Sequence, residues 1–228
     1  MAQTRYHRLV TTTILEVTMR STLAATLAGI LVLAACAPAT TAGVDTALPC
    51  ATDPIPVVAV IDFENTTGRT GGITVTGVED AATARLITLL KQSGCYDVVE
   101  RSELVNVMTQ QGLESMAPEA LARAAGAGYV VTGTVTRATI ARPQASVLGV
   151  SVGQTRAEVD IDVRATDIIT GRVLVSMTGR GEAAQGNVSI SRILPGTVSF
   201  DDREVGPLLA NASDDALAQV VNSIRTRF

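Results

Sequence analysis

One stretch, from Glu158 to Asp167, alternates between polar and apolar side chains as far as Thr166. Because successive side chains of a strand point to opposite faces, this alternation predicts a β-strand with one apolar and one polar face. The apolar positions of a helix recur every three to four residues instead. The chain is therefore expected to contain a sheet whose two faces differ in chemistry.

The rest of the sequence indicates further strands and several helices around this one. Strands are expected at 57–63, 96–99, 129–140 and 172–178, with another alternating stretch at 187–191. Helices are expected at 78–93 and from Pro118 to Gly126, and a further helix is expected to begin after Ser102 as its N-cap. A last helix is expected to carry Asp214 and Asp215 in its first turn and Arg225 and Arg227 in its last. This order predicts an α+β fold, a mixed sheet flanked by helices with an antiparallel strand-rich block.

An uncharged run from Leu23 to Ala35 precedes the folded part and ends at a cysteine. Thirteen residues are too few for a spanning helix, which needs roughly twenty. Behind Met19-Arg20, the run is typical of a signal-peptide core. Its end, Leu33-Ala34-Ala35-Cys36, resembles the bacterial lipobox. That resemblance implies a diacylglyceryl group on the Cys36 sulfur, cleavage before it, and a fatty acid such as palmitate on the new amino terminus.

These features divide the chain into a signal peptide at 1–35, a lipidated tether at 36–56 and one domain at 57–228. Charged residues before Met19 fit the signal poorly, so Met19 is a candidate for the true start. The tether is rich in Ala, Thr and Pro and has little periodicity. An oxidising compartment permits a disulfide between Cys50 and Cys95; the alternative is that Cys95 is a small buried side chain.

The composition argues against an enzyme and against a nucleic-acid partner. His7, the only histidine, lies before the cleavage site, which leaves no Ser-His, Cys-His or histidine-based zinc site. The Gly-Val-Ser-Val-Gly pattern at 149–153 therefore lacks the base that a nucleophile elbow needs. An isoelectric point near 5.1 without a Lys/Arg cluster, and the absence of tryptophan, disfavour nucleic acid. No metal site or cofactor is predicted.

Two weaker patterns have structural interpretations that we prefer. The glycines of 179–184 and 126–128 match loose dinucleotide-binding spacing in the wrong context, so they are expected to serve turns or close packing. Asp160 and Asp162 share one strand face about 7 Å apart, a spacing that suits an acid–base pair or a cation. We favour a solvated sheet face, because Glu158 and Arg164 lie on the same side.

Five segments in order resemble the CsgG family, the curli production assembly/transport lipoproteins. They cover 60–68, 98–104, 128–135, 167–174 and 204–206. The motif residues within them are Asp62, Phe63, Asn65, Gly68, Glu100, Arg101, Leu104, Gly133, Thr170 and Gly171.

The resemblance implies a lipid-anchored, periplasm-facing protein of the outer membrane that forms homo-oligomeric rings and supports export of curli-like extracellular protein. In the curli-type members each subunit adds two β-hairpins to a shared membrane channel. The candidate membrane hairpins here are 137–160 and 173–200. Two departures oppose a channel: the hairpin regions offer only Phe200 as an interfacial aromatic, and the loop at 69–77 has no aromatic. The alternative function is a periplasmic lipoprotein scaffold or activator of a cell-envelope machine without a pore.

Overall fold

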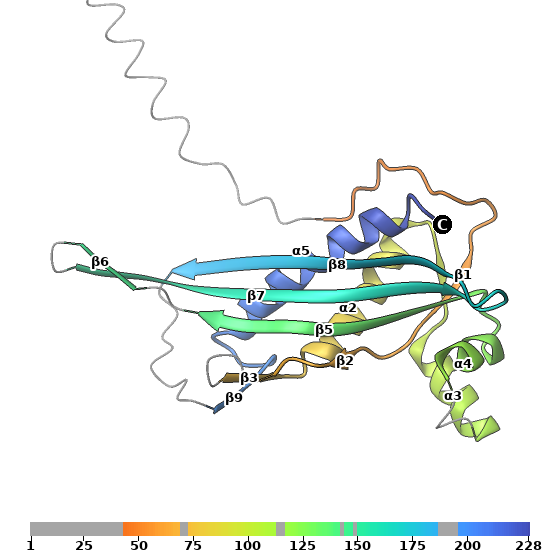
Figure 1. Ribbon diagram of the computed structural model, residues 1–228, viewed down its shortest axis with the longest axis horizontal. Helices are drawn as coiled ribbons and strands as arrows, with labels where there is room; N and C mark the ends of the chain where they lie inside the picture. Colours follow the sequence, from red (N-terminus) through yellow and green to blue (C-terminus); the bar gives the residue numbers. More distant parts are fainter. Residues whose placement is uncertain (1–42, 69–72, 113–116, 142–143, 148–149, 187–195) are drawn as a thin grey trace, which may run out of the picture. The chain divides into compact units, whose positions relative to one another are not determined.

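A computed structural model describes residues 43–68, 73–112, 117–141, 144–147, 150–186 and 196–228. Its elements, shown in Figure 1, follow in the order β1 (Val57–Val60), β2 (Glu64–Asn65), β3 (Ile73–Thr76), α2 (Val78–Ser93), β4 (Asp97–Val98), α3 (Arg101–Gln111), α4 (Pro118–Ala124), β5 (Tyr129–Ala141), β6 (Gln144–Val147), β7 (Val150–Asp167), β8 (Val173–Gly186), β9 (Gly196–Ser199) and α5 (Gly206–Ile224). The α+β prediction is confirmed.

The main sheet is mixed, as predicted. Its strands lie in the order β4, β1, β5, β7 and β8, with β2 beside β5 further along. The strands β4, β1 and β5 are parallel, whereas β5, β7 and β8 form the predicted antiparallel block. The short β6 pairs with the first residues of β7 and extends this block at one end, and β3 and β9 form a separate parallel pair.

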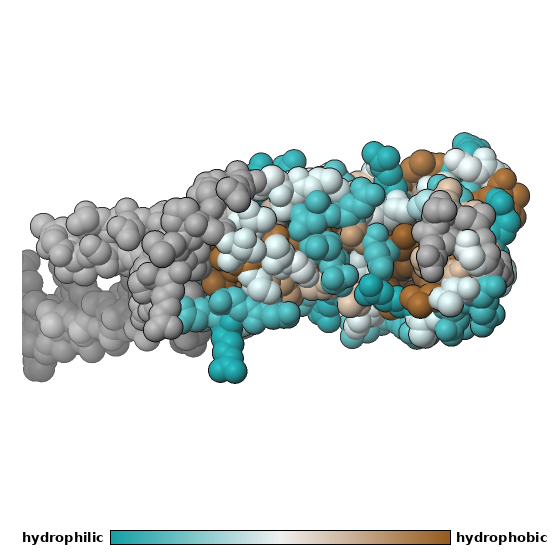
Figure 2. Space-filling view, turned by 90° about the horizontal axis from the view of Figure 1, so that it is seen from below, coloured by the Kyte–Doolittle hydropathy of each residue, from teal (hydrophilic) through white to brown (hydrophobic). Residues whose placement is uncertain are grey.

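The two faces of the sheet differ as the alternation of 158–167 predicts. Val159, Ile161 and Val163 are fully buried under α2 and α5, where the main core lies. A smaller core holds Ala59 and Val130, which face the other way, against α3 and α4. The molecule therefore has helices on both faces at the β1 end. Further along β5, β7 and β8, helices cover one face only (Figure 1). Seen from below that view, several hydrophobic residues are exposed at the end that carries α3 and α4 (Figure 2).

The helix boundaries follow local chemistry. Gly94, with φ of 71°, ends α2 as predicted, and its N–H donates to the Lys91 carbonyl. The prediction for the last helix was wrong at its start, because α5 begins at Gly206. The Asp202 carboxylate accepts N–H groups just before this helix, and Pro207 suits its first turn. Asp214 and Asp215 lie in mid-helix instead, where Asp214 accepts a 2.6 Å hydrogen bond from Arg85.

The predicted N-cap of α3 was also wrong by two residues. Its N-cap is Glu100, so Ser102 lies within the first turn, and no side chain caps this helix. The predicted strand at 187–191 lies outside the described residues.

Candidate interaction surface

The uncovered face of β5, β7 and β8 is a polar surface. In the register of the sheet, Asp160 lies between Arg137 and Arg180. The next row places Glu158 between Thr139 and Glu182, and the row beyond places Arg156 between alanines. We call this surface the open face; its charged residues are Arg137, Arg156, Glu158, Asp160, Asp162, Arg164, Arg180 and Glu182. Four positive and four negative side chains leave it without net charge.

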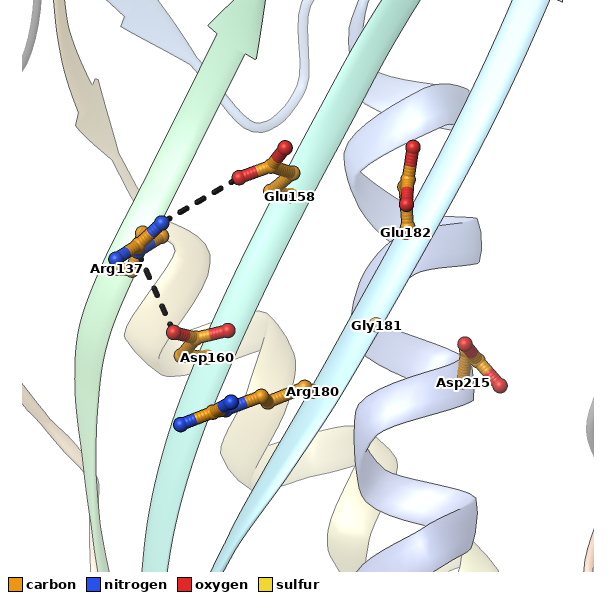
Figure 3. A pocket seen from close by; sticks show the side chains of 7 residues that line it. All are labelled: Arg137, Glu158, Asp160, Arg180, Gly181, Glu182 and Asp215. Carbon is orange, nitrogen blue, oxygen red and sulfur yellow. Dashed lines mark hydrogen bonds and ion pairs between the residues drawn. The ribbon is translucent and has the colours of Figure 1, made fainter.

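Neighbouring strands on the open face are joined by ion pairs. Arg137 contacts Glu158 at 3.5 Å and Asp160 at 3.3 Å, and Figure 3 shows both contacts. One step further along, Arg156 contacts Glu182 at 3.2 Å. A hollow of about 360 Å³ is lined by Arg137, Glu158, Asp160, Arg180, Gly181 and Glu182 of the sheet and by Asp215 of α5 (Figure 3). Because most of the paired groups are half exposed, each pair stabilises the sheet by only about 0–1 kcal/mol.

The open face does not assemble acid–base chemistry. Asp160 pairs with Arg137, whereas Asp162 accepts a 2.5 Å hydrogen bond from the Thr178 hydroxyl. The two carboxylates therefore have different partners, which fits a solvated sheet face. Within the ranges the model describes, no group of three or more His, Cys, Asp or Glu side chains is placed to hold a metal ion.

Several motif residues meet in pairs, and each pair has a structural role. Asp62, after β1, accepts a 2.9 Å hydrogen bond from Arg101 at the start of α3. Glu100 pairs with Lys91 of α2. Gly133 lies against the ring of Phe63, and a Cβ at that position would overlap the ring. These contacts connect the ends of β1, β5, α2 and α3.

The remaining motif residues order turns and a helix. Asn65 donates to Glu79 at 2.8 Å and accepts the Thr67 N–H at 3.0 Å, which holds the chain leading to Gly68. Leu104 is buried in the smaller core under α3. In the β7–β8 turn, Gly171 has φ of 68° and the Asp167 carboxylate accepts the N–H groups of Ile169 and Thr170. These hydrogen bonds, chiefly that of the Thr170 N–H and then that of Ile169, lower the pKa of Asp167 below its ordinary value.

The glycine patterns have the structural roles that the sequence suggested. Gly179 and Gly181 lie in β8 beneath α5, where added Cβ atoms would overlap the carbonyl oxygens of Ala216 and Ala212. Gly126, with φ of 75°, ends the α4 region before β5. Ser151 lies inside β7, in a β6–β7 hairpin and not in a strand-to-helix turn. The context that a nucleophile elbow needs is therefore missing around Ser151.

The two candidate membrane hairpins fall largely on strands of the main sheet. Segment 137–160 covers the end of β5, β6 and the first part of β7, and Ala138, Ala157 and Val159 are buried in the core. Segment 173–200 includes β8, which packs beneath α5, and β9, which pairs with β3. Residues 187–195 lie outside the described residues. No helix in the described part of the chain is both long enough and apolar enough to cross a membrane.

Cys50 and Cys95 form a disulfide, with their Cα atoms 5.3 Å apart. Cys95 is also buried, so the disulfide and the small buried side chain, which the sequence left as alternatives, occur together. The lipobox residues Leu33, Ala34, Ala35 and Cys36 lie outside the described residues.

Asn222 and Arg225 near the end of α5 are contact residues that the sequence did not reveal. The Arg225 guanidinium donates to the carbonyl oxygens of Asp45 and Leu48, and Asn222 accepts the Asp45 N–H at 2.8 Å. The sequence indicates Arg225 only as a positive charge that suits the C-terminal end of the helix dipole. Contacts across about 180 positions leave no local pattern in a sequence.

Tyr96 extends this region into the core. Its hydroxyl donates a 2.9 Å hydrogen bond to the Phe228 main-chain oxygen. Burial raises the pKa of Tyr96 above its usual range, and the charge of Arg225 opposes that rise. Tyr96 therefore stays a neutral hydrogen-bond donor.

Comparisons with solved structures find similar folds in bacterial proteins. The hypothetical protein CT253 of Chlamydia trachomatis aligns at 13% identity and a TM-score of 0.48, over 75% of this chain and 96% of that one. The PelC dodecamer of Paraburkholderia phytofirmans aligns at 18% and 0.42, over 77% and 92%. Lipoprotein GNA1162 of Neisseria meningitidis aligns at 19% and 0.40, over 74% and 97%.

Among curated proteins, none matches the sequence. The family model for the curli production assembly/transport component CsgG, in contrast, matches residues 46–227. This range includes every strand and helix of the described domain. The chain belongs to the CsgG family.

Proposed function

We propose that this protein is an outer-membrane lipoprotein that assembles into homo-oligomers and supports export or assembly of curli-like extracellular protein, without catalysis. The observation that carries the proposal is the family match over residues 46–227, which begins ten residues after the lipobox cysteine. The family description names a transport and assembly component, and the described residues assemble no catalytic group that argues for an enzyme.

The anchor in this proposal is lipid on Cys36. Two chains of a diacylglyceryl group and one amino-terminal acyl chain exceed the two signals that stable membrane attachment requires. Ala37 follows the cysteine in place of an aspartate, which by analogy with lipoprotein sorting favours the outer membrane over the inner one. The same cut removes residues 1–35 as a signal peptide and leaves the tether 36–56 before the domain 57–228.

The open face is suited to contact with an unfolded chain in transit. Its charges balance, several of them form ion pairs, and none of its charged rows presents an aromatic side chain. Such a wall has neither a net charge nor an apolar patch to retain a passing polypeptide. In this proposal the open face of each subunit is turned toward the path of the exported chain.

The decisive experiment is imaging of the full-length lipoprotein after detergent extraction from its native membrane. The expected result is a closed ring of identical subunits. In the same cells, deletion of the gene should abolish surface assembly of a secreted protein, and the intact gene should restore it. A Cys36→Ala variant should fractionate away from the membrane and fail to restore assembly. Single subunits in detergent, together with unimpaired secretion, would refute the proposal.

One observation favours a second candidate, a scaffold or activator of a cell-envelope machine without a pore. The strand β8 occupies much of the second candidate membrane hairpin, and its glycines fit closely beneath α5. A strand used in the domain core cannot at the same time contribute to a membrane channel. The same imaging separates the two candidates, because the scaffold predicts particles without density through the membrane and co-purification with an envelope enzyme.

A further inference from the structure

A disulfide and a set of hydrogen bonds fix the start of the described chain to the domain. The disulfide joins Cys50 to Cys95 beside β4. The Asn222 side chain accepts the Asp45 N–H at 2.8 Å and donates to the Gly43 carbonyl at 3.3 Å. We call this arrangement, together with the contacts of Arg225 described next, the clasp; it joins Gly43, Asp45 and Cys50 to Cys95, Asn222 and Arg225.

Arg225 is the central residue of the clasp. Only 2% of Arg225 is exposed, and its guanidinium reaches two carbonyl groups of the incoming chain, those of Asp45 and Leu48. Its own carbonyl accepts the Ala51 N–H at 2.9 Å. Hydrogen bonds to a charged group are stronger than those between neutral groups. Segment 43–51 of the tether is therefore bound to the domain 57–228, although its composition is that of a flexible linker.

The clasp changes the length of free chain between membrane and domain. A tether that was free up to Val57 would have a root-mean-square length of about 25 Å from Cys36. With segment 43–51 bound, only residues 37–42 separate Cys36 from the clasp. This connection, which we call the leash, spans at most about 24 Å.

We propose that the clasp holds the C-terminal end of α5 against the surface of the lipid bilayer. The proposal rests on the proposed lipidation of Cys36. This side of the domain is proposed to face a membrane surface. The leash joins the lipidated Cys36 to Gly43, which contacts Asn222, so the lipid cannot lie far from the end of α5. Asp45, Thr226 and Arg227 are exposed and polar here, and the exposed apolar side chains of the segment, Ala47 and Pro49, are small. The domain is therefore expected to lie on the headgroups without insertion.

Energy transfer to the membrane surface tests the proposal. The chain has no tryptophan, so a Thr226→Trp substitution beside the clasp gives a single donor. The full-length lipidated protein is reconstituted in phosphatidylethanolamine–phosphatidylglycerol vesicles that carry a dansyl-labelled headgroup as acceptor. The expected result is strong transfer to the headgroups, with donor emission at the wavelength of an indole in water.

Two variants test whether the short leash, and not another attraction between the domain and the bilayer, causes the energy transfer. The first carries a Gly/Ser spacer of about fourteen residues before Gly43, which gives the leash the length of an unclasped tether. The second removes the clasp by Cys50→Ser, Cys95→Ser, Asn222→Ala and Arg225→Met. Transfer should fall at least about twofold in both variants, and to the same level. The spacer leaves every residue of the domain unchanged, so it tests the leash even where the fourfold variant fails to fold.

Each other outcome contradicts a different claim. Unchanged transfer in the spacer variant would show that the domain binds the bilayer through its own surface. Reduced transfer with the spacer but not in a folded fourfold variant would show that the clasp does not limit the leash. All samples are first tested by flotation, which shows whether the protein is attached to the vesicles. Failure of the parent protein to float, or flotation of Cys36→Ala, would contradict lipidation and not the clasp.

Discussion

At the scale of single residues, Gly133 gives the clearest prediction, because the side chain that an added methyl group would meet is a single aromatic ring. The position lies in β5 against the ring of Phe63, and a Cβ there would overlap that ring. Both residues are buried, so the clash can be relieved only by moving packed atoms. Gly133→Ala should lower the free energy of unfolding by about 1–3 kcal/mol, measured by urea denaturation.

The matched control for Gly133→Ala replaces the neighbour. In a Phe63→Leu background the ring is gone, so the added methyl group has space and the cost of Gly133→Ala should become smaller. An equal cost in both backgrounds would contradict the packing explanation and indicate a backbone effect.

Asp167 gives a second prediction at this scale, a dependence of stability on pH. Its carboxylate accepts N–H groups of the β7–β8 turn, which lowers its pKa in the folded protein. A depressed folded pKa contributes stability above the unfolded pKa, and this contribution disappears as the pH falls through the folded value. The stability difference between the wild type and Asp167→Asn should therefore narrow from pH 5 downward in denaturation series. A constant difference down to about pH 2 would be inconsistent with this role.

At the scale of elements, the contact between β8 and α5 depends on glycine. Gly181 faces α5, and a Cβ there would overlap the Ala212 carbonyl oxygen, so Gly181→Ala should push the helix away from the strand. Glu182, the next residue, points to the open face. We expect Gly181→Ala to cost about 1–3 kcal/mol and Glu182→Ala no more than about 1 kcal/mol in the same denaturation assay. Similar costs for the two neighbours would contradict the two-faced strand.

The elements also show what the sequence can and cannot reveal. The alternation of 158–167 predicts both faces of β7 correctly, because the side-chain period of a strand is a local property. Gly94 marks the end of α2 correctly, because the preference for glycine in a left-handed residue that ends a helix is also local. The start of α5 was misplaced because Asp214 interacts with Arg85 of another helix and not with its own helix terminus. The open face follows from the alternation, whereas its ion pairs depend on a register between strands that no single segment encodes.

At the scale of the whole molecule, the clasp joins the beginning and the end of the domain. The hydrogen bonds of Arg225 span about 180 positions, and the disulfide closes a separation of 45 residues. A cross-link over such a loop restricts the unfolded chain far more than the folded one. Its loss should lower the free energy of unfolding by about 4 kcal/mol.

Reduction of the disulfide is therefore expected to lower the midpoint of urea denaturation without unfolding the native domain. Arg225 and Asn222 still hold segment 43–51 in the folded state, so circular dichroism in the absence of urea should stay unchanged. A Cys50→Ser, Cys95→Ser variant should show the low midpoint with and without reductant, which separates the disulfide from other effects of the reagent. An equal midpoint for the oxidised and reduced wild type would mean that Arg225 and Asn222 restrain the chain ends without help from the disulfide.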